Sequence, residues 1–182
     1  AAHRFLGSRW ADLDPLKRTE RPRIPELDPS FYDLTESDMD ITFSAANTYF
    51  GKAENMTLRE ILQSLRETYC GTIGAEFMHI TDPAEKRWWQ ERLESVRSKP
   101  SFNAEKKQHI LDRLTAAEGL ERYLHTKYVG QKRFSLEGGE SFIASMDEVV
   151  RRGGELGVQE IVIGMAHRGR LNVLVNTLGK MP

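Results

Sequence analysis

The chain has 182 residues, enough for one sizeable hydrophobic core or for a small core with an appendage. Its 26 lysines and arginines nearly balance 27 aspartates and glutamates, which gives a formal net charge of −1. This balance argues against attraction of the whole chain to nucleic acid or to an anionic membrane. No apolar run approaches the ~20 residues that a membrane-spanning helix needs. We therefore expect neither nucleic acid nor a membrane among its partners.

Two further features bound the class of protein. Cys70 is the only cysteine, so an internal disulfide is excluded, and no zinc-ligand spacing surrounds it. Its apolar neighbours predict an ordinary buried residue. The chain starts at Ala1 rather than at a methionine and stops within a predicted helix. We therefore expect a piece of a longer protein.

The first part of the chain is predicted to be a short helix followed by a connector. Apolar residues at helical spacing predict a lead-in helix over residues 1–11. Four prolines then fall within fifteen residues, and each removes a backbone donor and disfavours helix at the preceding residue. Residues 12–56 are therefore expected to be a proline-rich extended connector. Its acidic stretch, residues 36–40, is typical of a solvated loop, with a basic partner or a metal as the alternative.

Residues 57–129 are predicted to be helical. Thr57 and Glu60 have the pattern of a capping box, and an apolar stripe at helical spacing follows them. Gly71 and Gly74 interrupt the continuation of this stripe. Because glycine costs about 1 kcal/mol relative to alanine inside a helix, they indicate a break or a close helix contact.

Further helices complete this region. An N-cap aspartate and a proline begin a predicted helix over residues 83–97. Its tryptophan pair, Trp88 and Trp89, is predicted to be packing surface, with stacking on a planar ligand as the alternative. Residues 103–129 are predicted to be two helices, or one helix broken at Gly119.

Residues 130–182 have a different character. A polar loop with glycines precedes a predicted amphipathic helix. Basic residues followed by glycines mark the predicted end of this helix. An Ile/Val-rich strand is predicted over residues 159–164, followed by a turn and by a helix over residues 171–178. Such a strand is typical of a parallel sheet covered by helices on both faces. The expected fold class is a mostly helical region leading into the start of a parallel α/β domain, with the other strands beyond residue 182.

The candidate site is the turn after this strand, GMAHRGR at residues 164–170. Ligands of open α/β sheets bind at the carboxyl ends of the strands. Arg168 and Arg170 suit a diphosphate or a carboxylate, and His167 can donate to a carbonyl or exchange a proton. The residue types also allow both arginines to pair with surface carboxylates. A nucleic-acid site is disfavoured, because the chain has no net basic field and no stacking aromatics lie beside the motif. Dinucleotide and P-loop sites are disfavoured because their glycine-rich fingerprints are missing.

Three separated blocks resemble one family. They are GMAHRGRLNVL at 164–174, YCGTIGAEFMHI at 69–80 and KRFSLEG at 132–138. In this order they are similar to the 2-oxoglutarate dehydrogenase family, the thiamine-diphosphate-dependent first components of the 2-oxoglutarate dehydrogenase complex. The resemblance covers roughly residues 27–182. It implies that residues 130–182 are the start of a thiamine-diphosphate-binding parallel α/β domain.

The resemblance also implies an activity, in which 2-oxoglutarate is oxidatively decarboxylated in the tricarboxylic acid cycle. The succinyl unit passes to a lipoyl group of the acyltransferase component. His167 would hydrogen-bond the substrate or an intermediate, and Arg170, with Arg168 as second choice, would contact the diphosphate of thiamine diphosphate. A homodimer with the cofactor at the subunit interface is implied as well. The cytoplasm is the expected location, with the mitochondrial matrix as the alternative.

The sequence departs from the family in its metal ligands. Thiamine-diphosphate enzymes hold Mg²⁺ with a Gly-Asp-Gly segment, which these 182 residues lack, and no second domain supplies the activating glutamate. No metal ligand is therefore assigned here, and we expect this chain alone to be inactive and to bind the cofactor poorly. The alternative functions are a helical assembly module built on residues 57–129 and an anion-sensing domain.

The remaining titratable candidates are expected to be structural. His79 is predicted to lie on a helix among apolar residues. Glu137 and Glu140 precede a helix, where an acid is favourable through the helix dipole. Three further histidines lie on predicted helices without a convergent partner and carry no functional prediction: His3, His109 and His125.

Overall fold

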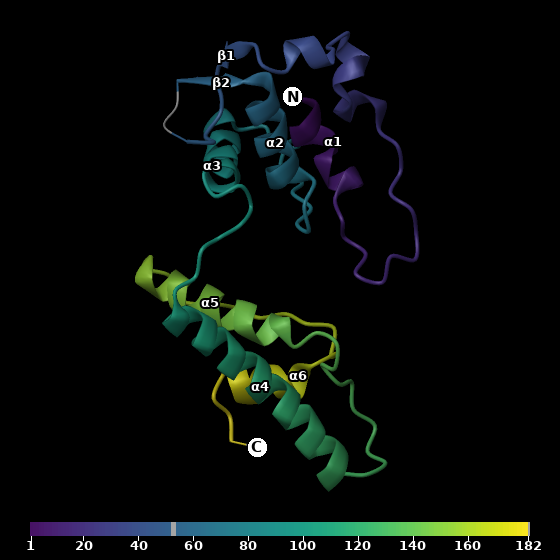
Figure 1. Ribbon diagram of the computed structural model, residues 1–182. Helices are drawn as coiled ribbons and strands as arrows, with labels where there is room; N and C mark the ends of the chain where they lie inside the picture. The colour runs from purple at the N-terminus through teal and green to yellow at the C-terminus, as the bar shows by residue number, and fades with distance from the viewer. Residues whose placement is uncertain (52–53, 182) are drawn as a thin grey trace. The chain divides into compact units, whose positions relative to one another are not determined.

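The computed structural model describes residues 1–51 and 54–181, which form two compact units (Figure 1). Unit 1 is Ala1–Ser101 and unit 2 is Phe102–Pro182. The division between them falls inside the predicted helical region 57–129. Residues 52 and 53 of the predicted connector and residue 182 of the last predicted region lie outside the described residues.

Unit 1 combines short helices with one small hairpin. In chain order its elements are α1 (Ala2–Trp10), η1 (Pro25–Leu27), η2 (Pro29–Tyr32), η3 (Glu36–Asp38), β1 (Thr42–Ser44), β2 (Asn55–Thr57), α2 (Leu58–Tyr69) and α3 (Pro83–Glu94). The strands β1 and β2 pair antiparallel, with Phe43 opposite Met56. The lead-in helix is confirmed by α1.

The connector is less extended than its prolines predict. Two of its prolines begin the 3-10 helices η1 and η2, because a fixed φ suits the first residue of a helical turn. The acidic stretch 36–40 begins with η3 and meets a basic partner within the same unit. Arg59 on α2 lies 2.6 Å from Glu36 and 3.2 Å from Asp40.

The start of α2 is as predicted. The Thr57 hydroxyl accepts from the Glu60 amide at 3.2 Å, and the Glu60 carboxylate accepts from the Thr57 amide at 2.9 Å. The helix ends at Tyr69, and residues 71–82 form no further helix. A Cβ on Gly74 would lie 2.9 Å from a Leu13 methyl, so the predicted break coincides with close packing. His79 is exposed on this irregular segment, so its predicted helical setting is wrong.

The core of unit 1 is small and centres on the end of α2. Four buried residues form it: Leu27, Tyr69, Cys70 and Phe77. Cys70 is 6% exposed, which confirms its predicted burial. Helix α1 packs closely on this core at Gly7, where a Cβ would lie 2.6 Å from the Cβ of Tyr69.

A buried carboxylate ties the core to α3. Glu94 is 0% exposed and accepts from Arg4 Nε at 2.7 Å, from the Tyr69 hydroxyl at 2.7 Å and from the Tyr49 amide at 3.0 Å. One side chain therefore connects α1, α2, α3 and the segment after β1. Burial and the hydrogen bond to Glu94 raise the pKa of the Tyr69 phenol, so Tyr69 acts as a donor here.

Helix α3 is shorter than predicted. It ends at Glu94, and the left-handed conformations of Arg97 and Ser98, with φ of 49° and 51°, prevent its continuation. Trp88 and Trp89 pack edge to face on each other with ring centroids 5.0 Å apart, and both remain exposed. Their predicted packing role is thus limited to this local contact and to Arg92, which lies over Trp88.

Unit 2 contains α4 (Ala104–Lys127), α5 (Ser141–Glu155), α6 (Arg170–Asn172) and the π-helical turn η4 (Val173–Thr177). Helix α5 packs against α4 (Figure 1). Four buried residues form the core: Ala117, Leu136, Ile143 and Val173. Helix α4 continues through Gly119, so the predicted break is absent. Helix α5 passes its two glycines and ends before Gly157, whose φ of +87° is left-handed.

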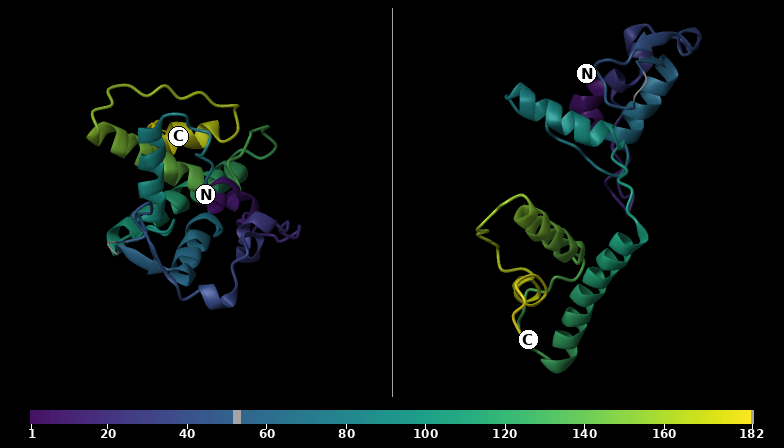
Figure 2. Two further views of the ribbon diagram at one scale, coloured as in Figure 1. Left: turned by 90° about the horizontal axis from the view of Figure 1, so that it is seen from above. Right: turned by 90° about the vertical axis from the view of Figure 1, so that its left-hand side faces the viewer.

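The strand predicted over residues 159–164 is wrong. These residues lie in an open stretch of chain between α5 and α6 (Figure 2), and Val162 is 95% exposed. A strand needs a neighbour to accept and donate its backbone hydrogen bonds, and none of the described residues pairs with this segment. Among the residues described, the only sheet is the β1–β2 hairpin. The mostly helical character is confirmed, whereas the start of a parallel α/β domain is not formed.

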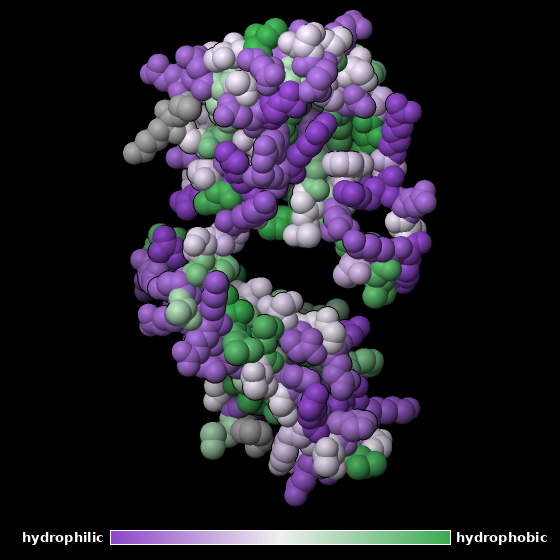
Figure 3. Space-filling view, in the orientation of Figure 1, coloured by the Kyte–Doolittle hydropathy of each residue, from purple (hydrophilic) through white to green (hydrophobic). Residues whose placement is uncertain are grey.

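Apolar side chains reach the surface of both units among hydrophilic ones (Figure 3). In unit 2 they include Leu156, which precedes the segment predicted as a strand, and Val162 within that segment. In residues 1–51 and 54–181, no helix is both long enough and apolar enough to cross a membrane.

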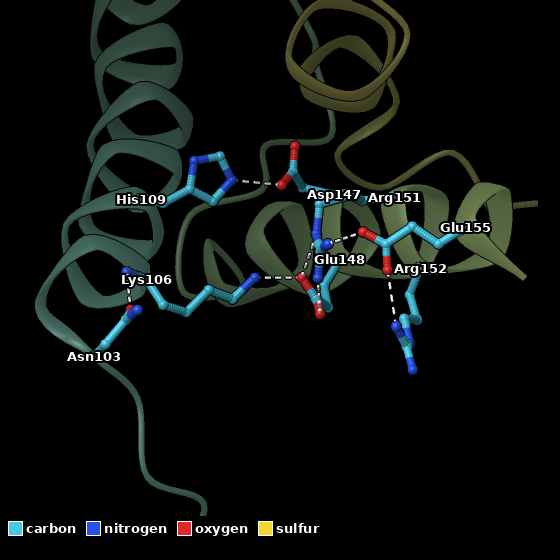
Figure 4. A network of polar contacts seen from close by, with 8 residues as sticks. All are labelled: Asn103, Lys106, His109, Asp147, Glu148, Arg151, Arg152 and Glu155. Carbon is cyan, nitrogen blue, oxygen red and sulfur yellow. Dashed lines mark hydrogen bonds and ion pairs between the residues drawn. The ribbon is translucent and has the colours of Figure 1, made fainter.

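A network of charged side chains joins α4 to α5 (Figure 4). His109 Nε2 lies 2.6 Å from Asp147, so the prediction that His109 lacks a partner is wrong. Glu148 accepts from Lys106 of α4 and from Arg151 of its own helix. The hydrogen bonds from Arg151 and Lys106 lower the pKa of the Glu148 carboxyl to about 2.

This lowered pKa predicts a pH-dependent stability. Unfolded chains protonate Glu148 near its ordinary value of 4.5, whereas the folded chain resists protonation down to about 2. The contribution of Glu148 is therefore present above that ordinary value and lost as the pH falls through this window. Urea unfolding should show the stability advantage of the wild type over Glu148→Gln shrinking as the pH falls through this range. Glu160→Gln, at an exposed position, is the control. An advantage that stays constant with pH would contradict the assignment.

Candidate functional site

The HRGR turn is held by two residues in left-handed conformation. His167 has φ of 75° and Gly169 has φ of 73°. Histidine rarely adopts this conformation, because its Cβ crowds the backbone. Gly169 is buried, and a Cβ there would lie 2.5 Å from a Leu136 methyl. The turn therefore requires glycine at 169 for both its backbone angle and its space.

Two of the blocks that resemble 2-oxoglutarate dehydrogenases lie side by side in this turn. The Gly169 amide donates to the Phe134 carbonyl at 2.8 Å. Arg168 Nε donates to the Ser135 carbonyl at 3.1 Å, and its Nη2 donates to the Glu137 carbonyl at 2.9 Å. The guanidinium of Arg168 thus fastens the loop 133–137 to the turn.

Arg170 has a different environment. It is exposed at the start of α6, and its Nη1 lies 3.5 Å from Nδ1 of the exposed His167. Among the described residues, neither Arg168 nor Arg170 pairs with a carboxylate, so the alternative of surface ion pairs is not observed. The structure therefore places the His167 and Arg170 side chains together and directs Arg168 to the loop.

Sequence reasoning missed the residue beneath this turn. Glu121 of α4 is 2% exposed, and its Oε1 accepts from the Leu136 amide and from Asn172 Nδ2, each at 3.1 Å. Arg133 Nε lies 3.5 Å from its other oxygen. Burial by itself raises the pKa of this carboxyl, but the hydrogen bonds outweigh burial and hold the pKa below its ordinary value. The carboxylate is therefore charged near neutral pH. The one available signal was the position of Glu121 four residues after Ala117 on the buried side of α4.

The other acidic candidates serve the loop itself. Glu137 accepts from the Ser135 hydroxyl at 2.9 Å, and Glu140 accepts from the Gly138 amide at 2.9 Å. Both contacts fix the turn before α5. Across residues 1–51 and 54–181, no three His, Cys, Asp or Glu side chains gather as they would around a metal ion.

Comparison with known proteins gives the family. No family model matches this chain. It is similar over its full length to proteins named 2-oxoglutarate dehydrogenase E1 component. The identity is 76% over 182 residues for the protein from Cupriavidus necator, 55% over 181 residues for Azotobacter vinelandii and 50% over 183 residues for Haemophilus influenzae. Each alignment covers 100% of this chain.

The chain spans about a fifth of these relatives, 19%, 19% and 20% of their respective lengths. Identity of at least 50% along the whole chain leaves no part of it outside the similarity. The chain belongs to the 2-oxoglutarate dehydrogenase E1 family of 2-oxoacid dehydrogenases, and it corresponds to an amino-terminal segment of those proteins.

The geometry of Gly169 predicts a large effect of one methyl group. Gly169→Ala should destabilise unit 2 by about 2–4 kcal/mol, because the left-handed backbone and the overlap with Leu136 both oppose a Cβ. Gly164→Ala is the matched control, since a methyl group at that position would have no neighbouring atom within 4 Å. Urea unfolding of the two variants measures the difference. Equal stability of both variants would refute this description of the turn.

Proposed function

We propose that this chain supplies one part of the active site of an enzyme that oxidatively decarboxylates 2-oxoglutarate on thiamine diphosphate. The enzyme would pass the succinyl unit to a lipoyl group of the succinyltransferase component of its complex. The observation that carries the proposal is the exposed His167–Arg170 pair within a chain that resembles 2-oxoglutarate dehydrogenase E1 components along its full length. The proposed substrate, 2-oxoglutarate, is supported by the name of those relatives, 2-oxoglutarate dehydrogenase E1 component.

The residues of this chain fit one contact to the cofactor. Arg170 presents an exposed guanidinium, permanently charged and with forked donors that suit diphosphate oxygens. Arg168 is the second choice, because it already donates to two loop carbonyls. The described residues offer no cluster for Mg²⁺, and the sequence has no Gly-Asp-Gly segment. The proposal therefore assigns the Mg²⁺ ligands to other parts of the enzyme. When bound, thiamine diphosphate supplies the electron sink for decarboxylation.

His167 is proposed to donate a hydrogen bond. Arg170 carries only donors, so the His167 nitrogen that faces it, Nδ1, acts as an acceptor in the neutral ring. The proton of neutral imidazole then lies on Nε2. This tautomer can donate to the keto oxygen or to a carboxylate of 2-oxoglutarate and can exchange that proton during the reaction.

The remaining parts of the proposal rest on the resemblance. They are a homodimer with the cofactor at the subunit interface and a cytoplasmic location, with the mitochondrial matrix as the alternative. The three relatives compared above come from bacteria, which favours the cytoplasm.

This role predicts the effect of removing the imidazole. In the full-length enzyme, His167→Ala should lower kcat for 2-oxoglutarate decarboxylation by about 10²–10⁴-fold, the usual contribution of a positioned proton donor. His167→Gln should retain part of the activity, because the Gln amide nitrogen can take the place of Nε2. Steady-state kinetics and circular dichroism on both variants test activity and folding together.

His79→Ala is the control, since His79 is exposed in unit 1. It should leave kcat unchanged. Normal turnover of His167→Ala together with altered assembly of the complex would contradict the catalytic role and support the helical assembly module instead.

A further inference from the structure

One buried carboxylate receives hydrogen bonds from both segments that form the HRGR site. Glu121 Oε1 accepts from the backbone amide of Leu136, which belongs to the loop 133–137. The same oxygen accepts from the side chain of Asn172, the last residue of α6. These partners are 15 and 51 residues away from Glu121 in the sequence. The loop and the helix, which come from different parts of the chain, therefore meet at one atom.

Both segments continue from Glu121 to the exposed pair. On the loop side, the carbonyls next to Leu136 hold the guanidinium of Arg168. On the helix side, Asn172 lies two residues after Arg170, and it is completely buried. Asn172 Nδ2 also donates to the Ala117 carbonyl at 2.8 Å. Asn172 Oδ1 accepts from Asn176 Nδ2 at 2.7 Å. The side chain of Asn172 is therefore fixed in one orientation.

We propose that Glu121 is a positioning residue, whose carboxylate sets the separation between the loop 133–137 and the HRGR turn and thereby orients His167. The inference deepens the proposed function and rests on it. Glu121 does not touch the His167 ring. It acts through Leu136 and Arg168 on one side and through Asn172 on the other.

A carboxylate is favoured because three donors face the two oxygens of Glu121. The Leu136 amide, the Asn172 amide group and the Arg133 guanidinium all present N–H groups to it. An ionised carboxylate has acceptor sites on both oxygens, whereas glutamine replaces one oxygen with an NH₂ group. Glu121→Gln can keep one carbonyl oxygen for Leu136 and Asn172, but its NH₂ group then faces the Arg133 guanidinium, donor against donor and without the negative charge. This repulsion moves the loop 133–137, which contains Arg133, away from α6. A misplacement of about 1 Å can cost on the order of 100-fold in rate.

Exchanging the carboxylate of Glu121 with the amide group of Asn172 tests the contact between these two side chains directly. In the full-length enzyme, Glu121→Gln and Asn172→Asp should each lower kcat by about 10- to 100-fold. The second substitution places two carboxylates against each other. The double variant no longer has two facing carboxylates, although the carboxylate at position 172 still meets the Ala117 carbonyl, so its kcat should exceed that of Asn172→Asp. The KM for 2-oxoglutarate should change less than kcat.

Folding is separated from positioning by matched measurements. Activities are compared per folded molecule, at temperatures below the unfolding transition of every variant. Glu118→Gln is the control, because Glu118 is on the same helix, is exposed and, among the residues that the structure describes, pairs with Arg122 alone, at 2.6 Å. It should keep the wild-type kcat.

The outcomes separate this inference from the proposed function. Wild-type kcat for Glu121→Gln, in an enzyme that His167→Ala inactivates, would overturn the positioning role and leave the proposed function in place. A lowered thermal transition with unchanged kcat per folded molecule would also overturn it, because that is the result of a purely structural role. Absence of 2-oxoglutarate decarboxylation by the wild type would overturn the proposed function itself.

Discussion

A carboxylate buried among donors is the interaction on which the candidate site depends. Removing an ionised group from water is costly unless hydrogen bonds and opposite charge replace its hydration. Glu121 meets this condition through Leu136, Asn172 and Arg133, and the cost of losing any one partner makes the arrangement specific. Unit 1 uses the same solution at Glu94. Small apolar cores are thereby supplemented by polar contacts that fix which segments meet.

This constraint explains why the two arginines of the HRGR turn differ. Arg168 directs its donors to backbone carbonyls of the loop that Glu121 holds, whereas Arg170 remains exposed beside His167. Two residues of the same type, two positions apart, thus make different contacts, one with the loop carbonyls and one with His167. The sequence could not distinguish them, because the two residue types are identical and only the position of the loop separates their roles.

Local signals predicted local structure well. The Thr57–Glu60 capping box depends only on neighbours in sequence, and the burial of Cys70 and the break after α2 were signalled by neighbouring apolar residues and glycines. Predictions that depend on distant partners were wrong. The Ile/Val-rich segment 159–164 finds no pairing strand among the described residues. Helix α4, which packs against α5, continues through Gly119. The sequence yields no prediction for Glu121, because periodicity carries no information about partners 15 and 51 residues away.

In the proposed enzyme, this chain supplies one part of a cofactor site, with the diphosphate contact at Arg170 and the metal ligands outside this segment. Calorimetric titration with thiamine diphosphate and Mg²⁺ tests this most directly, on the full-length protein and on the 182-residue chain side by side. We expect micromolar binding by the full-length protein and no comparable binding by the segment. Micromolar binding by the 182-residue chain alone would contradict this division of the site.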